Sequence, residues 1–571
     1  MKGGTVAVKP LPIGIDDFGK LISSGFYYVD KSMLVKELLD RRGEVNLFTR
    51  PRRFGKTLNM SMLKCFFEDT MEPAANEKNK GLFSGLKIMN QGDTYLDWMT
   101  SRCVINLSFK SGKQPNWKLA YGCLVEEISK EFVRHSIIRD TLKIEEHRRR
   151  FDDIMNLRGS WQDYVTSIRF LSDCLYQYTG QKVIILIDEY DVPLENAYFA
   201  GFYNEMAGFI RSIFESALKT NPGLEFAVIT GCLRITKESI FTGLNNLEMI
   251  SILNHSYGEF FGFVQEEIDE MLQYYGLMAQ RGRIQEWYNG YLFGNVQVYN
   301  PWSVANYVKA LTAAADELPA PYWANTSSNS IVRTLVEKSG VSVKKELEDL
   351  LAGGTIEKPV HEDITYDNVY ASEDNLWNFL FFTGYLKQIS RRLEQVTQYV
   401  TMGIPNLEVE YIYQHTINAW FKDEIKERDL TVLYQAIQEG NGETFQKELS
   451  RLLQSSISYM DNKEAFYHGF LLGILGNMKE YLVQSNREGG NGRYDIVIRS
   501  LDVSHPAMVL ELKVTDTYKG LESACDKALS QIKEKEYDSW LPEEGYTEVW
   551  NYGIAFFRKQ CKIKAEHRDL A

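Results

Sequence analysis

The sequence predicts an α/β protein: a parallel sheet with helices on both faces, then a helical middle region, then a second, smaller α/β domain. Three features of the chain indicate this. Short apolar runs alternate with longer amphipathic stretches through the first half. The 571 residues are too many for one ordinary hydrophobic core. After the glycine-rich stretch "SNREGGNGRYD" (485–495), short apolar runs return near the end of the chain.

Apolar runs in the first half are short and rich in β-branched residues. Such runs, apolar on successive residues, are typical of strands that are covered on both faces. The expected strands are 45–50, 103–109, 182–191 and 225–231. Helices are expected between them at 57–68, 117–133 and 201–219. Strands that alternate with helices in this way predict a parallel sheet.

The middle of the chain reads as helical and connecting. A proline opens a helix in "YNPWSVANYVKAL", and glycines end another in "VSVKKELEDLLAGG". The aromatic stretch "NLWNFLFFTGYL" (375–386) predicts a packed helix. The predicted domain boundaries are 1–290, 291–455 and 456–571.

The final part has its own alternation of strands and helix. Strands are expected at 494–499, 507–514 and 551–557. Between the last two, the segment 522–537 places Ala524, Ala528 and Ile532 on one helix face. These elements predict a compact α/β domain.

Composition limits the class of protein. The net charge of −13 disfavours non-specific coating of nucleic acid, although "RPRR" (50–53) and "HRRR" (147–150) are local basic clusters. The seven cysteines form no C-x-x-C pair, so neither a zinc site nor a disulfide framework is expected. We see no apolar signal sequence and no run long enough to span a membrane, and we therefore expect a cytoplasmic protein.

The segment "LFTRPRRFGKTLNMSML" (47–63) contains the end of a phosphate-binding loop. Such a loop needs converging backbone N–H groups, a lysine for the phosphate oxygens and a hydroxyl for Mg²⁺. Gly55, Lys56 and Thr57 supply these, and the preceding Arg53 and Phe54 complete the predicted nucleotide contacts. Arg50 stands where the first glycine of the loop is expected. The following helix places its N-terminus against the anion.

An acidic pair ends the strand "KVIILIDEYD". Asp188 could hold the metal, and Glu189 could orient or deprotonate the attacking water. Thr230 ends the next strand and could sense the γ-phosphate, with Arg234 close behind it. A solvated acidic turn, a surface arginine and ion pairs of Arg52 or Arg53 with acidic neighbours are the structural alternatives.

These segments, together with "WYNGYLFG", "YNPWSVANY" and "YWANTSSN", resemble the AAA-ATPase-like family over residues 10–330. The resemblance implies a P-loop NTPase fold with ATP and Mg²⁺ as cofactors. It also implies that P-R-R-F-G-K-[ST] is the ordinary form of this loop. In the N-terminal segment, Tyr28, Asp30 and Lys31 are candidates for covering the adenine side.

A second group of charged residues lies in the final domain. Glu511 and Lys513 are spaced i and i+2 on one expected strand, so they share a face. Asp495 opens the neighbouring strand and joins them if the strands pair. Two carboxylates can ligate Mg²⁺, and the lysine can stabilise charge that develops on phosphate. Gln531, on the following helix, could orient a water. The alternative is a sheet face on which Glu511 and Lys513 neutralise each other.

This ordered set resembles the PD-(D/E)XK nuclease superfamily over about residues 460–571, which implies a restriction-endonuclease-like fold. Tyr494 stands where that pattern has a proline. The superfamily often adds an upstream acid, for which Glu488 is the first candidate metal ligand and Glu464 the second.

The predicted function is therefore an ATPase coupled to a Mg²⁺-dependent nuclease domain, with DNA preferred over RNA as partner. Defence against foreign DNA, or its processing, is an expectation by analogy only. A homo-oligomer is expected if the ATPase site takes an arginine from a neighbouring subunit. The alternative is a nucleotide-switched binding module whose nuclease fold is inactive and only grips nucleic acid or protein.

Overall fold

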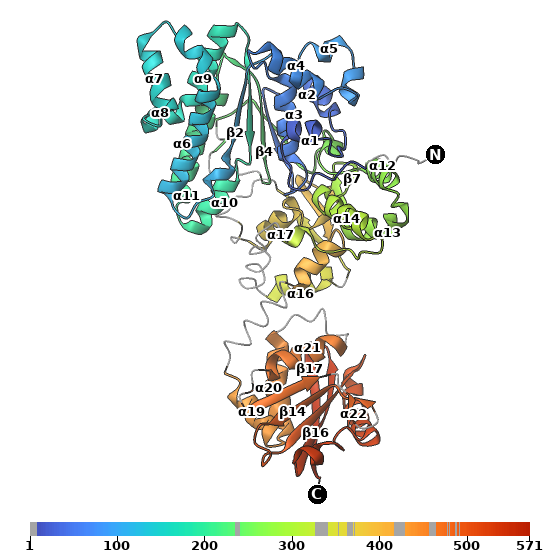
Figure 1. Ribbon diagram of the computed structural model, residues 1–571. Helices are drawn as coiled ribbons and strands as arrows, with labels where there is room; N and C mark the ends of the chain where they lie inside the picture. Colours follow the sequence, from blue (N-terminus) through green and yellow to red (C-terminus); the bar gives the residue numbers. More distant parts are fainter. Residues whose placement is uncertain are drawn as a thin grey trace, which may run out of the picture. The chain divides into compact units, whose positions relative to one another are not determined.

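The computed structural model describes most of the chain, shown as a ribbon in Figure 1. The described residues are 8–233, 240–241, 243–325, 341–351, 353–361, 369, 372–415, 429–455, 464–476, 478, 480–485, 488–489 and 492–570. They form two compact units, which we describe separately. The N-terminal unit comprises residues 1–328 and 355–412, and the C-terminal unit comprises 329–354 and 413–571.

A five-stranded parallel sheet forms the centre of the N-terminal unit, in the order β2-β3-β4-β1-β5. Its strands are β1 (Val45–Thr49), β2 (Val104–Ser108), β3 (Val183–Asp188), β4 (Leu224–Gly231) and β5 (Leu247–Ile250). Every residue of β1 and β3 is buried, as expected for strands covered on both faces. The four predicted strands of this sheet are confirmed, and β5 is an addition.

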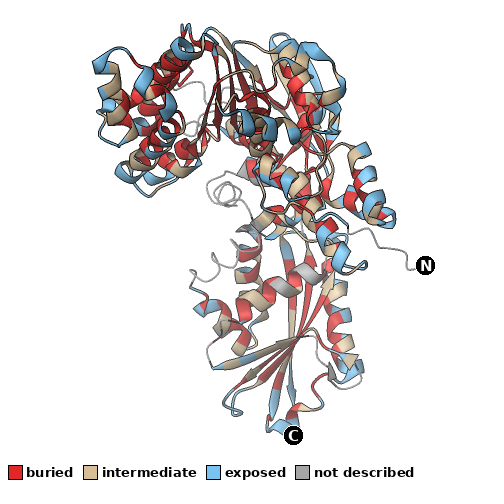
Figure 2. Cartoon of the chain, turned by 45° about the horizontal axis from the view of Figure 1, so that its top comes forward, coloured by how far each residue is buried: buried red, intermediate tan, exposed pale blue. Residues whose placement is uncertain are grey.

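Helices cover both faces of this sheet (Figure 1). On one side lie α1 (Phe18–Ser23), α2 (Met33–Arg41), α3 (Lys56–Phe67), α4 (Pro73–Gly81) and α5 (Asp93–Leu96). On the other lie α6 (Trp117–Arg134), α7 (Glu145–Met155), α8 (Trp161–Val165), α9 (Ser167–Thr179), α10 (Val192–Ala200) and α11 (Tyr203–Leu218). Figure 2 shows that the buried residues follow the strands and the inward faces of these helices.

The rest of the N-terminal unit joins a helical group to small sheets. The helices are α12 (Gln265–Tyr275), α13 (Arg281–Tyr288), α14 (Pro301–Ala313) and α17 (Glu373–Phe382). The hairpin β6 (Tyr291–Phe293) and β7 (Val296–Val298) lies between α13 and α14 in sequence. The strands β8 (Ile356–Pro359), β9 (Lys387–Glu394) and β10 (Thr397–Gly403) form an antiparallel sheet. The middle region is thus helical as predicted, but it also contains this unpredicted sheet, and residues 355–412 cluster with the N-terminal unit. The predicted domain boundaries remain a prediction.

The C-terminal unit contains a mixed five-stranded sheet in the order β11-β14-β15-β16-β17. Its strands are β11 (Tyr481–Ser485), β14 (Ile496–Ser500), β15 (Ala507–Val514), β16 (Glu548–Phe557) and β17 (Gln560–Asp569). A short hairpin, β12 (Glu488–Gly489) and β13 (Gly492–Arg493), stands apart from it. The predicted strands β14, β15 and β16 are confirmed, whereas β11 and β17 were not predicted.

Helices also cover both faces of this second sheet. The helix α22 (Leu521–Lys535) packs closely on one face. At Gly553 of this sheet there is no room for a side chain, because a methyl group there would lie 2.5 Å from the Cys525 carbonyl oxygen of the helix. The opposite face packs against α19 (Thr431–Gln438), α20 (Gly442–Ser455) and α21 (Glu464–Leu475). The unit also contains α16 (Val341–Leu351).

No helix among the described ranges has both the length and the apolar character needed to cross a membrane.

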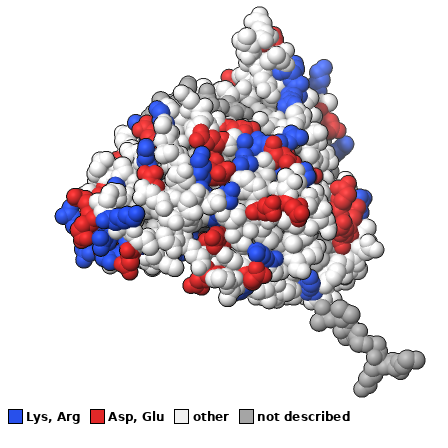
Figure 3. All heavy atoms as spheres, turned by 90° about the horizontal axis from the view of Figure 1, so that it is seen from above, with Lys and Arg blue, Asp and Glu red and all other residues white. Residues whose placement is uncertain are grey.

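Charges of both signs alternate on the face of the N-terminal unit seen in Figure 3. The basic cluster at 147–150 lies on α7, where Arg148 and Arg149 pair with Glu145 and Glu146 one turn earlier. This cluster is therefore a solvated, internally neutralised helix face, and it offers no uniform basic surface.

One buried carboxylate joins the end of the N-terminal unit to α14. Glu408 is fully buried and accepts hydrogen bonds from the Ser303 hydroxyl, at 2.8 and 2.9 Å, and from the Trp323 N–H, at 2.8 Å. Burial raises its pKa from 4.5 to about 7, although these hydrogen bonds oppose the shift. The protonated form of Glu408 is therefore favoured by folding.

This carboxylate predicts a pH-dependent stability. Because the pKa of Glu408 is higher in the folded than in the unfolded protein, protonation of Glu408 contributes to the free energy of unfolding. This contribution is complete below pH 4.5 and is lost as the pH rises through about 7. Between pH 5 and pH 8, the thermal midpoint of Glu408→Gln should fall less than that of the wild type in scanning calorimetry. The exposed Glu266, changed to Gln, is the matched control and should follow the wild type. Parallel curves for Glu408→Gln and the wild type would contradict this account.

Candidate functional sites

The phosphate loop turns from β1 into α3 through two left-handed residues. Arg53 has φ 70°, and Gly55, directly before the first residue of α3, has φ 82°. Glycine adopts this conformation without strain, which explains its position at the helix start. The twelve-residue helix α3 thus begins at the loop, and its first backbone N–H groups lack partners within the helix. This is the local geometry that favours an anion.

Lys56 points its ammonium group into the curve of this loop. Nζ donates to the carbonyl oxygens of Arg50 and Pro51, both at 2.9 Å, and lies 3.6 Å from Sγ of Cys232. The residue is only 7% exposed. The lysine is therefore held next to the backbone that a phosphate would face.

Arg50 anchors the loop from behind. Its fully buried guanidinium donates through Nη1 to the carbonyl oxygens of Thr49 and Ile250, both at 2.9 Å. It also lies 5.2 Å from the ring centroids of Phe261 and Phe293. Burial lowers its pKa to about 9, so the group stays charged at neutral pH. Arg50 therefore ties the loop to the neighbouring strand β5, a role that a glycine could not supply.

Aromatic residues from β6 and α14 hold the tip of the loop. The ring of Phe54 is buried edge-on against Tyr291, with centroids 4.9 Å apart. The Arg53 guanidinium lies 4.4 Å from the Trp302 ring centroid. The side chain of Phe54 is therefore part of the core, and any contact that it makes with a nucleotide has to use its backbone.

The acidic end of β3 lies beside the end of β4. Ile187 pairs with Ile229, which places Asp188 next to Thr230, and the Thr230 hydroxyl donates to the Asp188 carboxylate. Strand β4 lies between β1 and β3, so its carboxyl end separates the phosphate loop from the acids. This arrangement brings the predicted loop and acidic strand to one edge of the sheet.

Glu189 follows Asp188 with a left-handed backbone, φ 54°. Burial raises the pKa of its carboxyl group, the Asp188 charge adds to the rise, and Lys56 and Lys110 oppose it. A carboxyl group with a raised pKa beside a lysine suits a general base.

Two acids that sequence reasoning missed complete this edge. Asp191 is buried, and its Oδ2 accepts from the N–H groups of Cys232, at 2.7 Å, and Leu233, at 3.1 Å. Glu195 pairs with Arg52, which confirms an acidic partner for that arginine. Asp191 belongs to the motif "LIDEYD", so its spacing was visible in the sequence, whereas the partner of Arg52 lies 143 residues away.

Other predicted contacts of this site have different outcomes. Arg234 lies outside the described residues. Lys31 is buried in an ion pair with Glu267, at 2.6 Å, and Asp30 accepts from the N–H groups of Ser32 and Lys87. These contacts give the N-terminal segment a structural role, and its contribution to an adenine site remains a prediction.

The predicted charged residues of the C-terminal unit also converge. Strands β14 and β15 pair, and Oδ2 of Asp495 accepts from the Leu512 N–H at 2.8 Å. Nζ of Lys513 lies 2.8 Å from Oε1 of Glu511, which is 2% exposed. The carboxylate of Asp495 is therefore fixed to the backbone between Glu511 and Lys513.

Gln531 reaches this site through an unpredicted tyrosine. Its Nε2 donates to the hydroxyl of Tyr537 at 3.1 Å. Burial raises the pKa of Tyr537, and the charges of Glu511 and Asp495 add to the rise. The tyrosine thus lies within the field of both carboxylates. The side chains of Glu488 and Glu464 are outside what the structure describes, so their predicted role as metal ligands is untested.

Comparison with known proteins identifies a family for part of each unit. Residues 12–241 match the family model described as a predicted AAA-ATPase. Residues 462–566 match that of the PD-(D/E)XK nuclease superfamily. The chain joins an AAA-ATPase-like domain to a PD-(D/E)XK nuclease-superfamily domain.

A sequence relative matches part of this chain. An uncharacterised protein from the vnfD 5′ region of Azotobacter chroococcum mcd 1 is 27% identical over 330 residues. The match covers 57% of this chain and 56% of that protein.

Gly231, the last residue of strand β4 in the AAA-ATPase-like domain, allows one prediction. A methyl group at Gly231 would lie 2.5 Å from Cε1 of Tyr190 and 3.0 Å from Oδ1 of Asp191. Gly231→Ala should therefore displace both residues, lower the free energy of unfolding by about 2 kcal/mol and weaken ATP binding. Calorimetric unfolding and ATP titration measure the two effects.

Gly208, on α11, is the matched control because a methyl group there meets nothing within 4 Å. Gly208→Ala should leave stability unchanged or raise it by up to about 1 kcal/mol. Equal stability and equal ATP affinity in Gly231→Ala and the wild type would show that the end of β4 does not constrain the site.

Proposed function

We propose that the chain is a cytoplasmic ATPase whose nucleotide state controls Mg²⁺-dependent cleavage of nucleic acid, with DNA as the preferred substrate. The observation that carries the proposal is the convergence of Asp495 on Glu511 and Lys513, in a chain whose turn from β1 to α3 is the predicted phosphate loop. Defence against foreign DNA, or its processing, is the biological setting that we propose for this pair of activities.

The AAA-ATPase-like site suits ATP with Mg²⁺. Lys56 and the first N–H groups of α3 would hold the phosphates, and Thr57 and Asp188 would hold the metal. The fit rests on the buried ammonium group of Lys56, which already donates to two loop carbonyl oxygens and can exchange them for phosphate oxygens. Glu189, with its raised pKa, would accept a proton from water.

The nuclease-like site suits a hard cation. Carboxylate oxygens are the ligands that Mg²⁺ prefers, and Asp495 and Glu511 supply them from adjacent strands. When bound, Mg²⁺ supplies Lewis-acid polarisation of a phosphate oxygen. Lys513 would stabilise the charge that develops there, and Gln531 with Tyr537 would orient polar groups at the edge of the site.

A second candidate is a nucleotide-switched binding module. The ion pair between Lys513 and Glu511, at 2.8 Å, favours it, because a sheet face with a purely structural role would contain the same pair. In that case ATP would set the conformation of the chain, and the nuclease fold would only grip its partner.

Lys513→Ala separates the two candidates. The variant should lose Mg²⁺-dependent cleavage of nucleic acid at least about 100-fold, because the charge near the phosphate disappears, while ATP turnover stays within about twofold. Lys527→Ala, an exposed change on α22, is the control and should cleave as the wild type does. A wild-type protein that cuts no DNA or RNA with Mg²⁺ or Mn²⁺ would leave the binding module as the function.

Lys56→Ala tests the nucleotide site in the same preparations. The ATP affinity of Lys56→Ala should fall at least about tenfold. Lys64→Ala, about two turns further along α3, should bind ATP as the wild type does. Unchanged affinity of Lys56→Ala would refute the assignment of this loop.

A further inference from the structure

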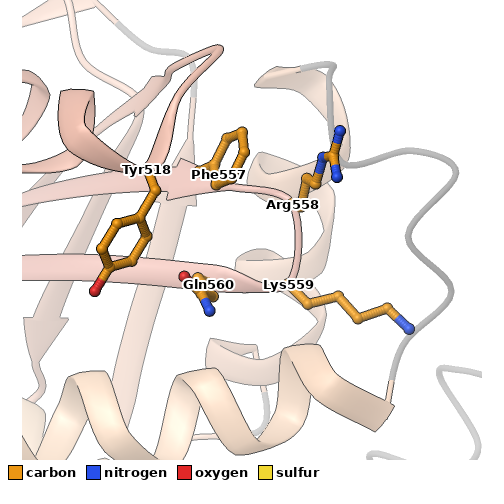
Figure 4. A pocket seen from close by; sticks show the side chains of 5 residues that line it. All are labelled: Tyr518, Phe557, Arg558, Lys559 and Gln560. Atoms are coloured by element: carbon orange, nitrogen blue, oxygen red, sulfur yellow. The ribbon is translucent and has the colours of Figure 1, made fainter.

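The nuclease-superfamily domain has a pocket whose lining does not include Asp495, Glu511 or Lys513. Its volume is about 560 Å³, and it is lined by Tyr518, Phe557, Arg558, Lys559 and Gln560. Figure 4 shows these side chains around the turn between β16 and β17, with Tyr518 contributed by the segment that follows β15. The two segments thus form one concave surface.

The strand register relates the position of this pocket to that of Lys513 in the candidate active site. Strands β15 and β16 are parallel, and Lys513 pairs with Ala555. Phe557 is two residues further along β16, about 7 Å at the usual rise, and its side chain is on the same face of the sheet as Lys513. The Thr515 N–H donates to the Phe556 carbonyl oxygen at 3.0 Å, which holds the segment leading to Tyr518 against β16. The pocket therefore lies past the level of Lys513, toward the carboxyl ends of β15 and β16.

The side chains of the pocket combine cations with an accessible ring. Tyr518 is 64% exposed, which is unusual for so large an aromatic group. Arg558 is exposed, and its guanidinium lies 5.3 Å from the Phe557 ring centroid. Residues 557–560 read Phe-Arg-Lys-Gln and include no acid.

The turn that presents these cations is held in place. Arg558 has φ 54°, and its carbonyl oxygen accepts from the Tyr467 hydroxyl at 2.9 Å. The position of the turn that carries Arg558 is therefore fixed by Tyr467.

We propose that Tyr518 and the 557–560 turn bind an unpaired stretch of nucleic acid and guide it to Lys513. Arg558 holds a phosphate, and the Tyr518 ring stacks on a base. Stacking needs an open base face, which paired bases in a duplex do not offer, so the substrate is single-stranded or has a single-stranded end. The inference rests on the proposed nuclease function and adds the substrate class and its location.

Binding is tested with the full chain and fluorescent 12-mer oligonucleotides in EDTA, so that metal-dependent cleavage is absent. Tyr518→Ala should weaken the binding of single-stranded DNA or RNA about tenfold, and Tyr518→Trp should restore it. Arg558→Ala should weaken binding and lower the salt dependence by about one counterion. Separate DNA, RNA and duplex probes show which strand the pocket takes.

The control removes two arginines from a different surface. Arg148→Ala with Arg149→Ala, on α7, should leave affinity within about twofold, because these residues pair with Glu145 and Glu146. Four results would each overturn the inference. Tyr518→Ala could bind as tightly as the wild type, or the control could lose as much affinity as the pocket variants. The wild type could also prefer duplex probes, or bind no oligonucleotide.

Cleavage assays separate this inference from the proposed function. If the wild type binds but does not cleave, and Tyr518→Ala loses binding, the pocket assignment stands and nuclease activity fails. If the wild type cleaves, and the pocket variants cleave with unchanged KM, nuclease activity stands and the pocket assignment fails.

Discussion

The buried guanidinium of Arg50 is the interaction on which the nucleotide site depends. A charge with no solvent contact is costly unless hydrogen bonds replace its water. Arg50 gains two such bonds, both from Nη1, to the carbonyl oxygens of Thr49 and Ile250, and it contacts the faces of two phenylalanine rings, whereas Nε and Nη2 have no hydrogen-bond partner among the described residues. These contacts tie the end of β1 to the end of β5. The backbone that follows is fixed as a result, and Lys56 donates directly to the Arg50 carbonyl oxygen. A residue that departs from the general phosphate-loop pattern is therefore part of the support of the loop.

Both candidate sites use the same construction. Each draws its charged side chains from strands of one sheet or from the turns next to them, and each fixes one carboxylate by a hydrogen bond from the neighbouring strand. Asp188 accepts from Thr230 in the N-terminal unit, and Asp495 accepts from the Leu512 N–H in the C-terminal unit. A carboxylate held in this way loses little conformational entropy when it binds a cation. The proposed ATPase and nuclease chemistries therefore both rest on pre-positioned acids.

The sequence revealed what local patterns encode and missed what distant contacts create. Apolar runs predicted β1 to β4 because both faces of these strands are buried, which leaves a continuous signal. Strand β9 was missed because nearly all of it is exposed and its sequence, "KQISRRLE", is polar. The spacing of Glu511 and Lys513 was readable, since period two places them on one face. Partners such as Glu195 for Arg52 and Tyr537 for Gln531 come from tertiary packing, and no local pattern marks them.

Titration of ATP with Mg²⁺ into Arg50→Gly tests the central claim most directly. The change restores the glycine of the general phosphate-loop pattern but removes the buried anchor. The account predicts a folded protein whose ATP affinity is at least about tenfold weaker than that of the wild type. ATP binding then has to order the loop, and this entropic cost lowers the net free energy of binding. Arg50→Lys, which keeps the charge but lacks the planar guanidinium that lies against Phe261 and Phe293, should have an intermediate ATP affinity. An Arg50→Gly protein that keeps the circular dichroism of the wild type and binds ATP equally well or more tightly would contradict the account.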